Sequence, residues 1–478
     1  MLRVEQDLGE LEALVRDLPR REPQLADFFD GAAEVLLTRA PGRLDVMGGI
    51  ADYSGSLVLE LPLADATCVA VARSDDAWLR VASRGATQPA APREARFPAR
   101  EFWHACRSEQ AARAYFAAQP SHVRWAAYAL GGLPLLAERG AELAGGLRLL
   151  IDSALPEGRG VSSSAALEVA AFSGLAAAWR VPFDGVELGL ACQRVENHVV
   201  GAPCGVMDQL TSACGEEGRL LALLCQPATL QSSLVLPDGV SVFGIDSGLG
   251  HEVSGSRYRQ VRAAAFMGLR ILSERLGARV RISGAGHVVL EDDPLAGYLA
   301  RLAPEVLSDE LAAALPERIS GAEFLARFGG VTDELSTLDP AVEYLVRAAT
   351  LHPIHEHARA QRFTQTLPFA TRSDLTALGA AMFASHASYS ACALGSDGTD
   401  QLVEAVRALG PESGLFGAKI TGGGSGGTVA ILARTEQLPL VQALCRDYVA
   451  KTGRGSRVFC GSSPGAVAVP ARRLALGS

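Results

Sequence analysis

The run SSAALEVAAFSGLAAAWR at residues 163–180 constrains the fold more than any other part of the sequence. It is apolar on nearly every side of a helix, so such a helix is stable only when other layers of structure cover it. Pro182 follows, and helices tend to end before a proline. The sequence therefore predicts a buried helix that begins directly after a Gly/Ser loop.

Strand-like and helix-like runs alternate along the rest of the chain. We expect an amphipathic helix over the first ~30 residues, and a surface loop at 85–100. We expect a mostly helical region at 258–380. Strands are expected at 33–41, 57–63, 68–74, 78–84, 147–155, 220–225 and 240–246, and on both sides of a Gly loop at 422–427. This interleaving predicts an α/β or α+β fold.

The length of the chain predicts more than one domain. With 478 residues it exceeds an ordinary single domain, and we place a boundary near residue 235, which gives domains 1–235 and 236–478.

Composition and charge exclude several classes of partner. Hydrophobic residues make up 48% of the chain, charged residues 20%, and the net charge is -9 without a block of Lys and Arg. Neither a nucleic acid nor an anionic membrane is therefore an expected partner. The N-terminus does not resemble a signal peptide, and the nine cysteines include no C-x-x-C pair. We expect free thiols in the cytoplasm, with no membrane span and a monomer as the plausible state.

The segment at 422–427, GGGSGG, satisfies two catalytic fingerprints and fails the context of both. The dinucleotide fingerprint G-x-G-x-x-G needs a following helix, but TVAILA reads as a strand. The hydrolase pattern G-x-S-x-G needs a later His, and every His precedes residue 387. A loop that approaches a ligand closely, or a flexible turn, remains.

The Gly/Ser loop PEGRGVSSS lies at the start of the predicted buried helix. Backbone N–H groups at a helix N-terminus form an anion site, and Ser hydroxyls can cap the helix, hold phosphate or bind magnesium. Simple capping explains the loop equally well. The Walker A pattern is absent from the sequence.

Carboxylates and one polar turn provide further candidates. Glu196 lies on the helix expected at 186–200, and Asp208 lies in the turn PCGVMDQL among apolar neighbours. Either could form a structural ion pair instead of acting in chemistry. The turn RAPGRLDVMGGIADYSG carries polar groups that could bind a polyol or simply form the turn: Arg43, Asp45, Asp52 and Tyr53.

Taken together, these three segments resemble the signature motifs of the GHMP kinase superfamily in its galactokinase branch. RAPGRLDVMGGIADYSG is similar to the sugar motif, PEGRGVSSSAALEVA to the ATP-phosphate loop and AKITGGGSGGTV to the C-terminal glycine loop. The resemblance implies an α+β fold with two domains: an N-terminal ribosomal-protein-S5-like α/β domain and a C-terminal ferredoxin-like α+β domain. It also implies phosphorylation of a sugar's anomeric hydroxyl with ATP and Mg²⁺.

The resemblance assigns roles to individual positions. Asp208 matches the catalytic aspartate and Arg43 its partner, while Glu196 and Ser164 match magnesium ligands. The residues implied in sugar binding are Asp45, Gly49, Ile50, Asp52 and Tyr258. Those implied in nucleotide binding are Trp125, Gly158, Gly160, Ser162, Ser163, Ser164, Gly422, Gly423 and Gly424.

One departure from the galactokinase pattern bears on the substrate. Galactokinases carry Glu-His, facing the hydroxymethyl end of galactose, where this sequence has Gly49 and Ile50. L-Arabinose in its pyranose form lacks that group, and VMGGIADYSGSLVLELPL is similar to the kinase part of plant L-arabinokinases. We expect L-arabinose as the substrate, with D-galactose as the alternative. A sugar and ATP sensor without turnover is a third possibility, although Arg43, Glu196 and Asp208 are all present.

Overall fold

The N-terminal half of the chain is built on one large mixed sheet. The computed structural model describes residues 1–478 except 86–92, 251–253, 285 and 477–478. Within the described residues the sheet has nine strands in the order β18-β1-β2-β5-β3-β4, with β6 pairing β2 and with β7 and β8 pairing β6. The strands are β1 (Glu34–Met47), β2 (Leu57–Ser74), β3 (Trp78–Arg84), β4 (Arg93–Pro98), β5 (Gly146–Ser153), β6 (Arg219–Leu224), β7 (Thr229–Leu230), β8 (Leu234–Val235) and β18 (Arg472–Ala475).

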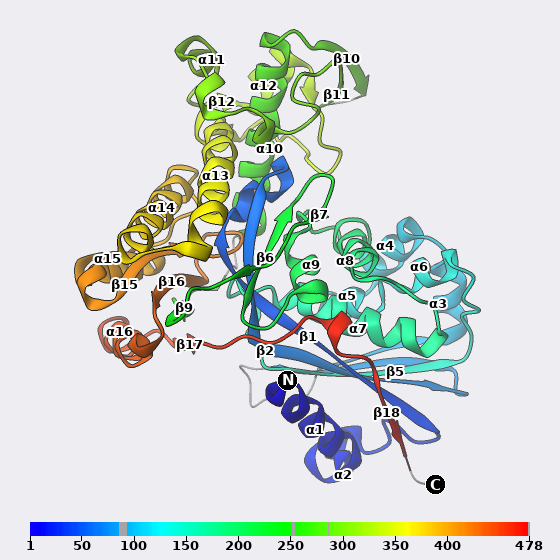
Figure 1. The fold of residues 1–478 in the computed structure, drawn as a ribbon. Coiled ribbons are helices and arrows are strands. Elements are labelled where there is room, and N and C mark those ends of the chain that lie inside the picture. The colour runs from blue at the N-terminus through cyan, green and yellow to red at the C-terminus, as the bar shows by residue number, and fades with distance from the viewer. Residues whose placement is uncertain (86–92, 251–253, 285, 477–478) are drawn as a thin grey trace.

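Helices cover both faces of this sheet, because its strands alternate apolar side chains between the two faces. In β2, Val69 and Val71 pack beneath α7 (Ser163–Trp179), while Ala70 and Ala72 pack beneath α1 (Leu2–Arg16). Figure 1 shows α1 on the opposite side of the sheet from α7. The helices are α1 (Leu2–Arg16), α2 (Leu18–Arg21), α3 (Ala99–Ala105), α4 (Glu109–Ala118), α5 (Ala126–Leu130), α6 (Leu133–Glu138), α7 (Ser163–Trp179), α8 (Gly185–Arg194) and α9 (Met207–Cys214).

The buried helix predicted at 163–180 is confirmed as α7. It packs against β1 and β2 and beneath α5, α8 and α9. Its buried residues are distributed around its whole circumference, as its uniformly apolar sequence requires. The helix ends at Trp179, where Arg180 adopts a left-handed conformation with φ 56°.

The C-terminal half contains a second sheet and a set of long helices. Four antiparallel strands lie in the order β15-β16-β9-β17: β9 (Val240–Asp246), β15 (Leu415–Ile420), β16 (Thr428–Arg434) and β17 (Val458–Phe459). The helices are α10 (Ser254–Arg275), α11 (Asp309–Ala314), α12 (Gly321–Phe328), α13 (Val346–Thr366), α14 (Arg372–Ala391), α15 (Asp397–Leu409) and α16 (Leu438–Thr452). Helices α10 and α13 pack together. Beside them lie the small strands β10 (Arg279–Gly284), β11 (Gly286–Glu291), β12 (Ile319–Ser320), β13 (Gly330–Val331) and β14 (Glu343–Tyr344).

Several expected elements differ from those observed. Residues 57–63 and 68–74 form one continuous strand, β2, whose pairing with β1 runs past Pro62 and Asp65. The expected loop at 85–100 contains β4 and the start of α3, and residues 86–92 lie outside the described chain. The region at 258–380, expected to be mostly helical, also contains five short strands among its described residues. The boundary near residue 235 stays a prediction; the last strand, β18, returns to pair with β1.

Among the described residues, no helix combines the length and apolar character needed to cross a lipid bilayer.

Candidate active site

A cavity of about 570 Å³ brings most of the sequence-predicted site residues together. It lies where the end of β1, the start of α7, the start of α9 and the loop between β15 and β16 meet. Fourteen predicted residues line it: Arg43, Ile50, Asp52, Trp125, Gly158, Gly160, Ser162, Ser163, Ser164, Glu196, Asp208, Tyr258, Gly422 and Gly423. Asp45, Gly49 and Gly424 lie behind the lining.

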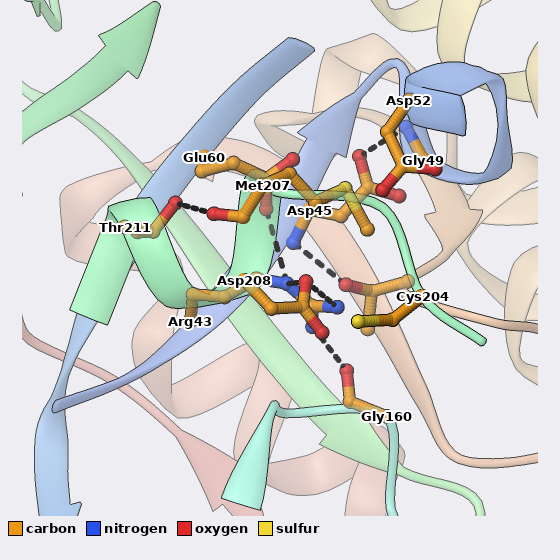
Figure 2. Close-up of polar contacts among 12 residues, drawn as sticks. Arg43, Asp45, Gly49, Asp52, Glu60, Gly160, Cys204, Met207, Asp208 and Thr211 are labelled. Carbon is orange, nitrogen blue, oxygen red and sulfur yellow. Dashed lines mark hydrogen bonds and ion pairs between the residues drawn. The ribbon is translucent and has the colours of Figure 1, made fainter. Parts of the chain in front are cut away.

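An arginine–aspartate pair stands at the centre of the cavity wall. Arg43 lies within β1, next to a register shift at Pro41, rather than in the turn expected from the sequence. Asp208 lies in the first turn of α9 instead of the expected turn, where the helix dipole favours a carboxylate. Arg43 donates to Asp208 Oδ1 from Nε at 3.0 Å and from Nη2 at 2.7 Å, and its Nη1 donates to the Gly160 carbonyl at 2.6 Å (Figure 2).

A second carboxylate behind this pair was missed by the sequence analysis. Glu60 of β2 is fully buried, and its Oε2 lies 3.1 Å from Arg43 Nε. Burial raises the pKa of Glu60 well above its usual value. Burial alone would lower the pKa of Arg43, but the charges of Asp208, Glu60 and Asp45 raise it above its ordinary value. The guanidinium is therefore a fixed cation that keeps the Asp208 carboxylate oriented.

The serine-rich loop places hydroxyl groups at the N-terminus of α7. Ser162 adopts a left-handed conformation with φ 56°, and its buried hydroxyl has no hydrogen-bond partner in the described structure. Ser164 hydrogen-bonds to Glu196, which lies in a π-helical turn at Val195–Val200. Such turns are often found at functional sites. Burial, followed by the charge of Asp208, raises the pKa of Glu196 to about 7.

The donors at this end of the cavity suit a magnesium ion. Mg²⁺ takes oxygen ligands, commonly one or two protein groups together with water and phosphate oxygens. Ser164 and Glu196 supply a hydroxyl and a carboxylate, and Gln209 Nε2 holds the Glu196 Oε2 at 2.6 Å. Within the described residues, no group of three or more His, Cys, Asp and Glu side chains is arranged to hold a metal.

Asp52 lies on the opposite wall, in the 3-10 helix Gly49–Ser54. Its carboxylate accepts from its neighbour Tyr53 N–H at 2.6 Å, and burial together with the charge of Asp208 raises its pKa to about 7. Tyr258 stands nearby, its ring edge-on to Tyr53 at 5.9 Å. The carboxylate packs directly on Gly205, where an added Cβ would lie 1.6 Å from Asp52 Oδ2.

Asp45 forms a buried ion pair instead of lining the cavity. Its Oδ2 lies 2.5 Å from Lys419 Nζ on β15, and both side chains are completely buried. The pair connects β1 of the large sheet to β15 of the second sheet. Ile50 lines the cavity, whereas Asp45 does not.

A patch beside Trp125 was also missed by sequence reasoning. Arg93 lies over the Trp125 ring, 5.2 Å from its centroid, and forms an ion pair with Glu157. All three line the cavity together with Tyr128. The only sequence signal was the arginine content of 85–100, which does not indicate where a side chain lies.

Models of two families match this chain. "GHMP kinases N terminal domain" matches residues 126–216 and "GHMP kinases C terminal" matches residues 366–450. The first contains the serine loop, Glu196 and Asp208, and the second contains the loop at 422–427.

Two curated relatives agree with these matches. A protein from Arabidopsis thaliana named L-arabinokinase is 40% identical over 94% of this chain, and the chain spans 47% of that relative's length. A galactokinase from Chloroflexus aggregans is 31% identical, over 89% of this chain and 91% of its own length.

Solved structures show the same fold. The galactokinase of Lactococcus lactis, complexed with galactose, matches with a TM-score of 0.68 and 20% identity over 94% of this chain and 98% of its own. The mevalonate kinase of Methanococcus jannaschii matches with a TM-score of 0.55 and 12% identity over 89% and 98%. The α+β GHMP kinase fold expected from the sequence is confirmed, and the chain belongs to the GHMP kinase family.

Proposed function

We propose that this chain is a sugar 1-kinase that transfers the γ-phosphoryl group of ATP to an anomeric hydroxyl, with L-arabinose as its preferred substrate. The products are a sugar 1-phosphate, ADP and the proton released from the hydroxyl. The observation that carries this proposal is the Arg43–Asp208 pair, which faces one cavity together with the N-terminus of α7. Nine cysteines without disulfides fit the cytoplasm expected from the sequence.

Asp208 and Arg43 would act on the sugar hydroxyl. Phosphoryl transfer depends mainly on positioning and on neutralising charge. Arg43 occupies Oδ1 of Asp208 with two hydrogen bonds, and the Asp208 side chain is 25% exposed toward the cavity. Asp208 can therefore orient the anomeric hydroxyl and accept its proton as the O–P bond forms.

The opposite end of the cavity would hold the nucleotide. The N–H groups at the start of α7 and the unpaired Ser162 hydroxyl can bind phosphate oxygens. Ser164 and Glu196 would hold Mg²⁺, which offsets the negative charge of the phosphates when bound. The Trp125 ring forms part of the lining and is available to pack on adenine; its buried Nε1 has no partner in the described structure.

The sugar end of the cavity supports a pentose. Ile50 lines the cavity where galactokinases have a polar residue, and at Gly49 an added Cβ would lie 1.7 Å from Tyr389 Oη. This wall therefore offers no side-chain partner from either position to a hydroxymethyl group. A site that lacks a hydrogen-bond partner loses binding energy for a polar substituent that must be desolvated. The Arabidopsis relative's name agrees with this assignment.

D-Galactose is the second candidate, favoured by the Chloroflexus aggregans relative. The experiment that tests the kinase reaction is incubation of the purified chain with ATP, Mg²⁺ and L-arabinose, with the product analysed by phosphorus NMR. We expect phosphate on C1. Phosphate on another hydroxyl would contradict the placement of Asp208, and absence of turnover with every aldose would favour a sensor.

Replacing Gly205 by alanine is expected to raise the KM for the sugar about 10- to 100-fold, the cost of losing a charged hydrogen bond. The added Cβ would overlap the Asp52 carboxylate and push it from its position. Steady-state kinetics with varied sugar measure the effect. Gly9→Ala on α1 is the matched control because nothing lies within 4 Å of its added Cβ. An unchanged sugar KM in Gly205→Ala would remove Asp52 from the sugar site.

A further inference from the structure

The turn that follows β1, residues 48–50, is called the sugar-site turn here. Each of its three consecutive backbone N–H groups donates to a buried side chain. Gly48 N–H donates to Glu356 Oε1 at 3.1 Å, and Gly49 N–H donates to Asp45 Oδ1 at 3.1 Å. Ile50 N–H donates to Tyr389 Oη at 2.9 Å. Glu356 comes from α13 and Tyr389 from α14. The conformation of this N-terminal turn is therefore set largely by C-terminal helices.

Tyr389 is the member of this set that reaches two walls of the cavity. Its hydroxyl accepts from Ile50 N–H and donates to the Gly422 carbonyl at 3.1 Å. Ile50 and Gly422 both line the cavity, whereas Tyr389 is completely buried behind them. Lys419 Nζ lies 5.3 Å from the centroid of the Tyr389 ring. One hydroxyl thus connects the sugar-site turn to the C-terminal glycine loop.

The same hydroxyl takes the space that a side chain at residue 49 would need. Gly49 adopts φ +44°, and an added Cβ would lie 1.7 Å from Tyr389 Oη, 2.8 Å from Tyr389 Cζ and 2.7 Å from Asp45 Oδ2. Contacts below 3.0 Å from a Cβ require a neighbour to move, and Tyr389 is packed on every side. Gly49 and Tyr389 therefore form a complementary pair.

We propose that Tyr389 is a positioning residue that determines sugar specificity by holding Ile50 and Gly422 in place. This inference rests on the proposed function, because it assigns that function's pentose preference to a residue behind the cavity wall. Tyr389 excludes a polar side chain from position 49 and fixes the Ile50 backbone, so the wall stays apolar and close to the sugar. The hydrogen bond from its hydroxyl to the Gly422 carbonyl fixes the position of that wall relative to the glycine loop.

The test is Tyr389→Phe, with Tyr344→Phe as the matched control. Both substitutions remove one buried hydroxyl, and Tyr344 accepts from Asp339 N–H at 2.9 Å in the small β12–β14 sheet, outside the cavity lining. In Tyr389→Phe, the Ile50 N–H and the Gly422 carbonyl lose their partner. We expect the kcat/KM for L-arabinose to fall about tenfold or more, and the ratio of L-arabinose to D-galactose kcat/KM to fall with it. Tyr344→Phe should retain the wild-type values. A Tyr389→Phe enzyme with an unchanged ratio would overturn the proposal.

Hydrogen exchange separates this inference from the proposed function. Mass spectrometry of a peptide that covers residues 45–56 reports on the amides of Gly48, Gly49 and Ile50 without any substrate. We expect faster exchange of this peptide in Tyr389→Phe than in the wild type, and no change in Tyr344→Phe. If the wild type phosphorylates neither sugar, the proposed function fails while this measurement still tests the role of Tyr389. Unchanged exchange in Tyr389→Phe would show that its hydroxyl does not hold the turn.

Discussion

The Asp208→Asn variant is expected to lose about 10²- to 10⁴-fold in kcat for sugar phosphorylation, the usual contribution of a positioned general base. An amide keeps the size of the side chain but cannot accept the hydroxyl proton. The amide also loses the charge that the two donors of Arg43 face at 3.0 and 2.7 Å. Nucleotide binding should persist, because the serine loop and Trp125 are unchanged. Steady-state kinetics and calorimetric titration with ATP measure the two effects separately.

Asp397→Asn provides the matched control for this substitution. Asp397 also lies in the first turn of a helix and also pairs with an arginine, Arg454, at 2.8 Å. It is largely exposed, at 63%, and lies outside the cavity lining. This variant should keep wild-type kcat. If Asp208→Asn turned over as fast as Asp397→Asn, Asp208 could not be the group that receives the proton.

Replacing Arg43 by methionine is expected to reduce both stability and activity. The side chain is 2% exposed, and its loss leaves Asp208 and the Gly160 carbonyl without their donor and Glu60 without the cation beside it. Breaking a buried ion pair by removing one partner costs about 3–5 kcal/mol. Urea unfolding should show a loss of this order, and phosphorylation should fall sharply because nothing then orients Asp208.

Two further variants distinguish the structural and the catalytic roles of Arg43. Arg43→Met combined with Glu60→Gln removes the buried acid that has lost its cation, so stability should partly recover while activity stays low. Arg80→Met is the control: Arg80 is also buried and pairs with Asp27 and Glu94, but outside the cavity lining. It should lose stability and keep kcat for the remaining folded enzyme. Recovery of activity in the double variant would contradict the assignment of Arg43.

Local patterns predicted the elements of the fold better than their extent. The run that forms α7 is apolar on nearly every side, so the sequence predicted a buried helix, and the structure confirms this prediction. The N-terminal motif looked like a turn because of its glycines, yet β1 continues through Arg43 and Asp45 to Met47. Pairing with β2 across two register shifts compensates for the turn-like sequence. Such tertiary support is not visible in a single strand's sequence.

The contacts within the candidate site were even harder to predict from the sequence than the extent of the strands. Arg43 and Asp208 are 165 residues apart, so only their resemblance to known motifs could place them together. In the sequence, Glu60 is one charged residue within the strand expected at 57–63, and Lys419 is one charged residue in the strand expected before the glycine loop. Glu60 meets Arg43 through the pairing of β1 with β2, whereas Lys419 meets Asp45 only where the second sheet packs against the first. Tyr389 belongs to no motif, and its contact with Gly49 appears only when α14 packs behind the sugar-site turn.

The measurement that tests the central claim most directly compares kcat/KM for L-arabinose and D-galactose, using the wild-type chain with saturating ATP and Mg²⁺. The apolar wall at Ile50, with no side chain on Gly49 behind it, predicts a preference for L-arabinose of about tenfold or more, the range expected for one mismatched substituent. Equal or greater efficiency with D-galactose would contradict this account and would require another part of the cavity to bind the hydroxymethyl group.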